Sequence, residues 1–136
     1  AGSAKAVFNL GVLAQDGAVD SPADALDYFR RAARDGESDG YRAAAILLDE
    51  GRGVERDPDE ASVLLLRGVA EDRGTLIRQL TGSTTEWSRD TLIEVQDRLK
   101  QAGYYAGALD GLPGPNFNAA LEKWRNGGFK PEVLVN

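Results

Sequence analysis

The chain has 136 residues, with 16 lysines and arginines against 22 aspartates and glutamates, a formal net charge of −6, and no histidine, cysteine or methionine. This acidic balance argues against nucleic acid or anionic lipid as a partner, because both require a clustered basic surface. Without histidine and cysteine there is no Ser/His/Asp arrangement, disulfide framework or thiolate metal site, so we expect no catalytic residue, no metal and no cofactor.

Residues 4–80 have the pattern of paired helices. We expect a first helix at about 4–16 and a second at about 22–35, where apolar residues recur at helical spacing. Ser21 is a favourable N-cap for the second helix, and Asp24 completes a capping-box pattern three residues later. The start of this helix is therefore strongly indicated.

The same pattern recurs further along the chain. A third helix is expected at 38–50, and a fourth begins after Asp57 with a proline in its first turn. The apolar positions of the fourth helix align with those of the second at an offset of 36, and Gly51 aligns with Gly17 at an offset of 34. A repeat of this period is typical of an α/α solenoid, in which helical hairpins stack on one another.

One loop carries a more specific pattern, which is Gly51-Arg52-Gly53-Val54 followed by Asp57-Pro58 and Ala61. This pattern resembles the SEL-one-like repeat family, relatives of tetratricopeptide repeats with a glycine-rich loop in each unit. The tightly packed helices of that family need small residues, which are present at positions 11, 32, 45 and 68. The resemblance implies repeats at 4–36 and 38–73, a partial unit at 74–80, and a protein partner bound through the repeats. Since two repeats are few for an independent solenoid, we expect more of them upstream in a larger parent protein.

A polar break of small residues at 81–85 separates these repeats from the rest of the chain. Ser88 is expected to cap a helix at about 89–102, and a final helix is expected from about Pro115 to Asn126. The last residues, Phe129 to Asn136, are expected to form a short extended tail.

Between these two helices lies a dense run of turn residues, Gly103-Tyr104-Tyr105-Ala106-Gly107 with Asp110-Gly111 and Gly114-Pro115. Together with Val95 and Leu99 before it and Ala120 and Leu121 after it, this run is similar to the peptidoglycan-binding-like domain, a small helical module of cell-wall hydrolases and envelope proteins. The resemblance implies such a domain at 86–136, truncated because its third helix has almost no room. It also implies a glycan site formed by Tyr104, Tyr105, Asp110, Asn116, Asn118, Trp124 and Arg125.

The aromatic residues of this module allow two interpretations. Tyr104 and Tyr105 either pack in the core or stack on a sugar ring, with Asp110 accepting hydrogen bonds from sugar hydroxyls. Asp110 before a glycine is also ordinary turn chemistry. The same choice between core packing and sugar stacking applies to Trp87 and Trp124.

Together the two resemblances imply an all-α, non-enzymatic scaffold or adaptor in the bacterial periplasm. The pairing is similar to the periplasmic end of alphaproteobacterial polar-localisation scaffolds, and the chain is then a fragment of a larger, membrane-anchored protein that contacts peptidoglycan. No segment reaches the roughly 18 apolar residues of a membrane span, so no membrane contact is expected within these residues. The alternative is a pure protein-interaction module whose wall-binding fold only caps the solenoid. A wall-active enzyme would need a catalytic domain elsewhere.

Overall fold

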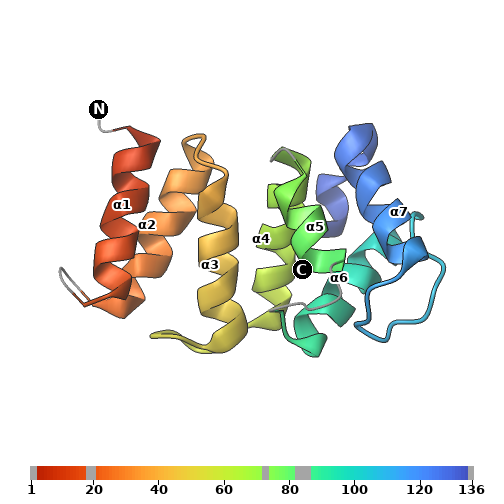
Figure 1. Ribbon diagram of the computed structural model, residues 1–136, viewed down its shortest axis with the longest axis horizontal. Helices are drawn as coiled ribbons and strands as arrows, with labels where there is room; N and C mark the ends of the chain where they lie inside the picture. Colours follow the sequence, from red (N-terminus) through yellow and green to blue (C-terminus); the bar gives the residue numbers. More distant parts are fainter. Residues whose placement is uncertain (1–2, 18–20, 72–73, 82–86, 135–136) are drawn as a thin grey trace.

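The protein is all-α throughout the residues that the structure describes, which are 3–17, 21–71, 74–81 and 87–134 (Figure 1). This computed structural model confirms the expected fold class. The α-helices are α1 (Ala4–Gln15), α2 (Pro22–Arg34), α3 (Asp39–Glu50), α4 (Pro58–Glu71), α5 (Thr75–Thr81), α6 (Arg89–Gln101) and α7 (Pro115–Lys123). A π-helical turn, η1 (Trp124–Gly128), and a 3-10 turn, η2 (Pro131–Leu134), complete the chain.

The helices begin where local side chains satisfy free backbone N–H groups. The backbone N–H of Ser21 donates to the Asp24 carboxylate at 3.1 Å, as the capping box predicts. Asp57 and Ser88 each accept the backbone N–H three residues further on, at 3.1 and 3.2 Å. Gly51 ends α3 in the left-handed conformation, with φ of 71°. These starts and this stop are confirmed.

The first four helices lie side by side in chain order, each packed on the next (Figure 1). Beyond α4 the order changes, because α5, α6 and η1 all pack against α4, and α7 packs on α5. The C-terminal helices therefore cover the side of α4 that α3 leaves open.

Small residues lie where neighbouring helices approach most closely. A Cβ atom on Gly11 would stand 2.5 Å from the Phe29 ring, and one on Gly40 would stand 2.5 Å from the Phe29 carbonyl oxygen. A Cβ on Gly68 would meet Leu76 at 2.5 Å. The helix contacts therefore leave little room for larger residues at positions 11 and 68, where the resemblance implies small ones.

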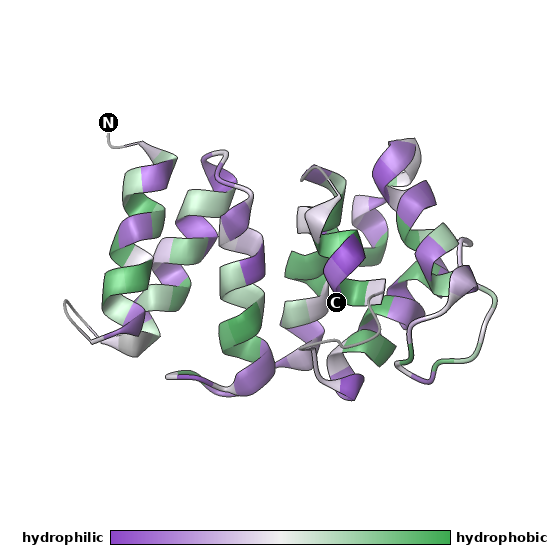
Figure 2. Ribbon diagram, viewed as in Figure 1, coloured by the Kyte–Doolittle hydropathy of each residue, from purple (hydrophilic) through white to green (hydrophobic). Residues whose placement is uncertain are grey.

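The outer helix α1 keeps an apolar surface. Leu10, Val12 and Leu13 are 40%, 37% and 43% exposed, and α1 is largely green in Figure 2 although it lies at the end of the row. An apolar stripe on a helix normally faces a core. The expectation of further repeats upstream stays a prediction.

The end of the chain differs from the expected extended tail. Pro131–Leu134 form a 3-10 turn in which Val133 and Leu134 are buried. The two apolar side chains join the common core, and the Lys130 ammonium donates to the carbonyl of Ala102 at 3.0 Å. The preceding helix α7 also ends at Lys123, earlier than expected, because the chain passes into a π-turn with Gly127 at φ of 104°.

Candidate functional site

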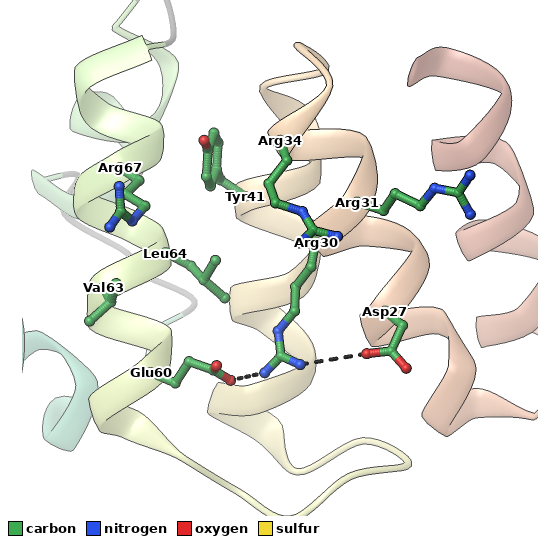
Figure 3. A pocket seen from close by; sticks show the side chains of 9 residues that line it. All are labelled: Asp27, Arg30, Arg31, Arg34, Tyr41, Glu60, Val63, Leu64 and Arg67. Carbon is green, nitrogen blue, oxygen red and sulfur yellow. Dashed lines mark hydrogen bonds and ion pairs between the residues drawn. The ribbon is translucent and has the colours of Figure 1, made fainter. Parts of the chain in front are cut away.

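A concavity lies between α2 and α4, with α3 behind it (Figure 3). It encloses about 690 Å³. Its charged lining consists of Asp27, Arg30, Arg31 and Arg34 from α2 and of Glu60 and Arg67 from α4. We call this concavity the α2–α4 groove. It places a basic surface on a chain whose net charge is −6.

Both carboxylates of the groove are already paired with one arginine. The Arg30 guanidinium lies 3.6 Å from the Asp27 carboxylate and also contacts the Glu60 carboxylate directly. Within the part of the chain that the structure describes, Arg31, Arg34 and Arg67 form no ion pair. These guanidinium groups are therefore available to an external anion.

An aromatic ring and two aliphatic side chains form the apolar part of the groove. Tyr41 of α3 stands between Arg67 and Arg34 in Figure 3, and Val63 and Leu64 line the α4 wall. Burial, together with a hydrogen bond to the Glu71 carboxylate, raises the pKa of Tyr41 to about 12. The phenol is therefore neutral at physiological pH.

A second hollow of about 430 Å³ adjoins the groove and shares Tyr41 and Arg67 with it. Ala70 and Glu71 of α4 also line it, together with Phe129. Phe129 comes from the C-terminal region and is 39% exposed. The concave surface is thus built jointly by the helical row and by the chain end.

Two of the aromatic residues predicted to bind glycan are buried. Trp124 is 0% exposed, and its indole N–H donates to the carbonyl of Leu66 at 2.8 Å. Tyr105 is 7% exposed, donates its hydroxyl to the Ala108 carbonyl at 2.7 Å and packs edge-on against Phe117. Neither ring offers an open face for a sugar, which agrees with the core-packing interpretation of both.

Asp110 is engaged within its own turn. Its carboxylate accepts the backbone N–H of Leu112 at 3.0 Å and the side-chain amide of Gln96 at 3.3 Å. The hydrogen bond from Leu112 is the main reason why the pKa of Asp110 lies below its usual range. The Gln96 side chain also accepts the backbone N–H of Gly111 at 2.8 Å, so the turn is tied to α6.

The other predicted glycan residues lie nearer the surface. The Tyr104 ring is half-buried, with the ammonium groups of Lys123 and Lys130 at 5.5 and 5.2 Å from its centre. Asn116 and Asn118 are exposed, and Arg125 is half-buried. A shallow hollow of about 350 Å³ is lined by Asn118 with Thr81, Pro113, Gly114 and Pro115. The structure therefore does not bring the predicted residues together on one face.

A buried carboxylate joins the helical row to the C-terminal region. Asp49, at the end of α3, accepts hydrogen bonds from the backbone N–H of Ser88 at 3.0 Å and from the hydroxyls of Ser88 and Thr91. The guanidinium of Arg56 donates to the Asp49 carbonyl and to the Ser88 hydroxyl, both at 2.7 Å. The start of α6 is therefore held against the end of α3.

A buried arginine makes a second connection. Arg98 of α6 is 5% exposed and contacts the Asp59 carboxylate and the Ser62 hydroxyl of α4. The same guanidinium donates to the carbonyl of Val133 at 2.7 Å. One side chain thus connects the helical row, α6 and the C-terminal turn.

No family model, curated protein or solved structure matches the chain, so both resemblances stay predictions. Across the described ranges, no group of three or more acidic side chains is placed to hold a metal ion. The helices described here are also all too short or too polar to cross a membrane.

The arginine surface was not anticipated from the sequence. Arg30, Arg31 and Arg34 occur on one helix, which indicates only a solvated face, and Arg67 lies on another helix, about 36 residues further along the chain. The sequence signal for this surface is the offset of about 36 residues, because it predicts that α2 and α4 occupy equivalent positions of two repeats.

Proposed function

We propose that this chain is a non-enzymatic protein-interaction scaffold that binds a partner in the α2–α4 groove. The observation that carries the proposal is a set of arginines, Arg31, Arg34 and Arg67, that form no ion pair with any described residue and lie beside an apolar strip in an otherwise acidic chain. A concave surface with a few charged groups around an apolar floor is the usual form of a recognition site. Because the chain has neither histidine nor cysteine, it lacks the commonest general base and the thiolate nucleophile.

In this proposal the C-terminal helices serve as the cap of the helical row. An array of stacked helices needs its last apolar face covered. Trp124, Arg98 and Thr91 all direct buried hydrogen-bonding groups toward α3 or α4. The buried position of Trp124 supports this alternative over a primary role in sugar stacking.

The groove is tested by selecting random peptides from a display library on the immobilised chain. The selected peptides are then measured on Val63→Trp, which adds bulk inside the groove, and on Leu112→Trp, which adds the same bulk at a residue that is 52% exposed elsewhere. We expect Val63→Trp to weaken binding and Leu112→Trp to leave it unchanged. Peptides that bind both variants with the same affinity as the parent chain would contradict a role for the groove.

Contact with peptidoglycan in the periplasm is the second candidate function. The hollow beside Asn118 and the cation-flanked ring of Tyr104 favour it. The test is co-sedimentation with purified sacculi. Tyr104→Ala and Asn118→Ala should lower retention, whereas Gln101→Ala, an exposed change on α6, should not. Equal retention of all variants would contradict this site.

A further inference from the structure

The geometry points to an acidic, extended segment of a partner protein as the ligand of the α2–α4 groove, and to a path along α4 that ends on Phe129. This inference rests on the proposed function and specifies the ligand. One ligand would then contact both the helical row and the C-terminal region, because the groove and the second hollow share Tyr41 and Arg67.

The charge of the ligand follows from the pairing within the groove. Arg30 takes both local carboxylates, which leaves Arg34 and Arg67 on either side of Tyr41 without an anionic partner in the described parts of the chain. Guanidinium groups bind carboxylates through paired, charge-assisted hydrogen bonds. A segment with glutamate or aspartate at this point completes the charge balance that the groove itself lacks.

The chemistry changes along the groove. At the second hollow, Glu71 would repel a carboxylate, while Ala70 and the exposed Phe129 offer apolar contact. Tyr41, whose hydroxyl is neutral, lines both regions. The ligand should therefore carry its carboxylates at the end near Arg34 and an apolar side chain, preferably aromatic, at the end near Phe129.

The length of α4 limits the length of the ligand. A helix of 14 residues is about 21 Å long, and an extended chain advances about 3.3 Å per residue. About six residues of an extended segment therefore cover the whole surface.

The test uses a fluorescein-labelled peptide of about six residues, with glutamates at one end and a phenylalanine at the other. Two comparison peptides replace the glutamates by glutamine or the phenylalanine by serine. We expect fluorescence anisotropy to detect binding of the acidic peptide, weaker binding of the serine peptide and at least about tenfold weaker binding of the glutamine peptide. Binding of the acidic peptide should also weaken as salt is added.

Substitutions in the protein test where on the surface the peptide binds. Arg34→Gln with Arg67→Gln should weaken binding of the acidic peptide by about tenfold or more. The matched control, Arg78→Gln with Lys100→Gln, removes the same charge from exposed sites on α5 and α6 and should leave binding unchanged. Phe129→Ala should weaken the acidic peptide and leave the serine peptide unaffected. Thermal unfolding followed by circular dichroism confirms that each variant is folded.

Three results would overturn the inference. They are equal binding of the glutamine and acidic peptides, equal loss in the control variant, and a second copy of the chain occupying the groove, detected as a dimer by sedimentation and blocking the peptide. Failure of the proposed function is distinguishable from these results. If library peptides depend on Val63 but are not acidic, the groove binds a partner and only its inferred chemistry is wrong.

Discussion

The indole N–H of Trp124 donates a hydrogen bond to the backbone carbonyl of Leu66, and the two residues, 58 positions apart in the chain, are both 0% exposed. Leu66 belongs to the predicted repeats, and Trp124 belongs to the predicted wall-binding module. The two segments therefore share one core, which also includes Val133 and Leu134 at the chain end.

This shared core predicts a single cooperative unfolding transition. Urea unfolding followed by tryptophan fluorescence, which reports on Trp87 and Trp124, should coincide with unfolding followed by far-ultraviolet circular dichroism. Trp124→Ala should lower the free energy of unfolding by about 3–5 kcal/mol, because it leaves a large cavity and an unpaired carbonyl. Phe129→Ala, at a partly exposed ring, should cost much less. Two separate transitions would contradict the shared core.

Replacing Arg98 tests the buried connection between α6 and α4. Arg98→Met should lower the free energy of unfolding by about 3 kcal/mol or more, because Ser62 and the Val133 carbonyl lose their donor. Arg98→Lys should also destabilise, since an ammonium group cannot reproduce the planar fork. Lys100→Met, at an exposed position of the same helix, is the control, measured by urea unfolding. Equal stability of the Arg98 and Lys100 variants would show that the buried fork contributes nothing.

The carboxylate of Asp49 should also contribute substantially to the free energy of unfolding. Asp49→Ala removes the acceptor of the Ser88 and Thr91 groups and should cost about 2–3 kcal/mol. The neighbouring Glu50 is exposed and pairs with Arg52, so Glu50→Ala should cost less than about 1 kcal/mol. Chemical denaturation of both variants gives the comparison, and a loss at Glu50 as large as that at Asp49 would not fit the observed burial.

Replacing Gly40 by alanine tests the close contact between α2 and α3. Helix propensity alone predicts that Gly40→Ala stabilises by about 1 kcal/mol. Here the new Cβ would stand 2.5 Å from the Phe29 carbonyl oxygen and 2.8 Å from the Ala33 nitrogen, so we expect a loss of about 1–3 kcal/mol. The control is Gly114→Ala, where a Cβ meets nothing within 4 Å, and its effect on the midpoint of thermal unfolding should be small. A stabilised Gly40→Ala variant would refute the contact.

The raised pKa of Tyr41 predicts that the folded protein loses stability at high pH. Its folded pKa of about 12 lies above the ordinary value of 10.0, so between these values the unfolded chain has released the proton and the folded chain still holds it. The contribution of this group is therefore complete below about pH 10 and is lost as pH rises toward 12, by up to roughly 2 kcal/mol. Burial also raises the pKa of Tyr105, so ultraviolet titration should show late-titrating tyrosines, one of which is absent in Tyr41→Phe. An unchanged titration in that variant would rule out this assignment.

Much of the secondary structure was predictable because its signals are local. Ser21 with Asp24, Asp57 and Ser88 each act on backbone groups within three residues, and their helices begin as expected. The chain end was not predictable in the same way. Val133 and Leu134 adopt a turn because their burial against distant residues outweighs any local preference.

The candidate site is harder to predict from the sequence than the fold. The sequence is compatible with Tyr105 and Trp124 as ligand residues or as core residues, and it does not distinguish between these roles. The burial of the two rings decides between these roles, and their burial depends on which helices pack against them. The α2–α4 groove has the same origin, because Arg34 and Arg67 lie near one ring only through the packing of α2, α3 and α4.

Local chemistry thus specifies the helices of this protein, their caps and the small residues at their contacts, since hydrophobic period and capping act within one or two helical turns. Packing between distant segments specifies the rest. It buries Arg98 and Trp124 as connections to α4, and it assembles a basic groove on an acidic chain. The physical reason is that the surroundings of a side chain, and hence its charge partners and exposure, are set by residues far away in the sequence.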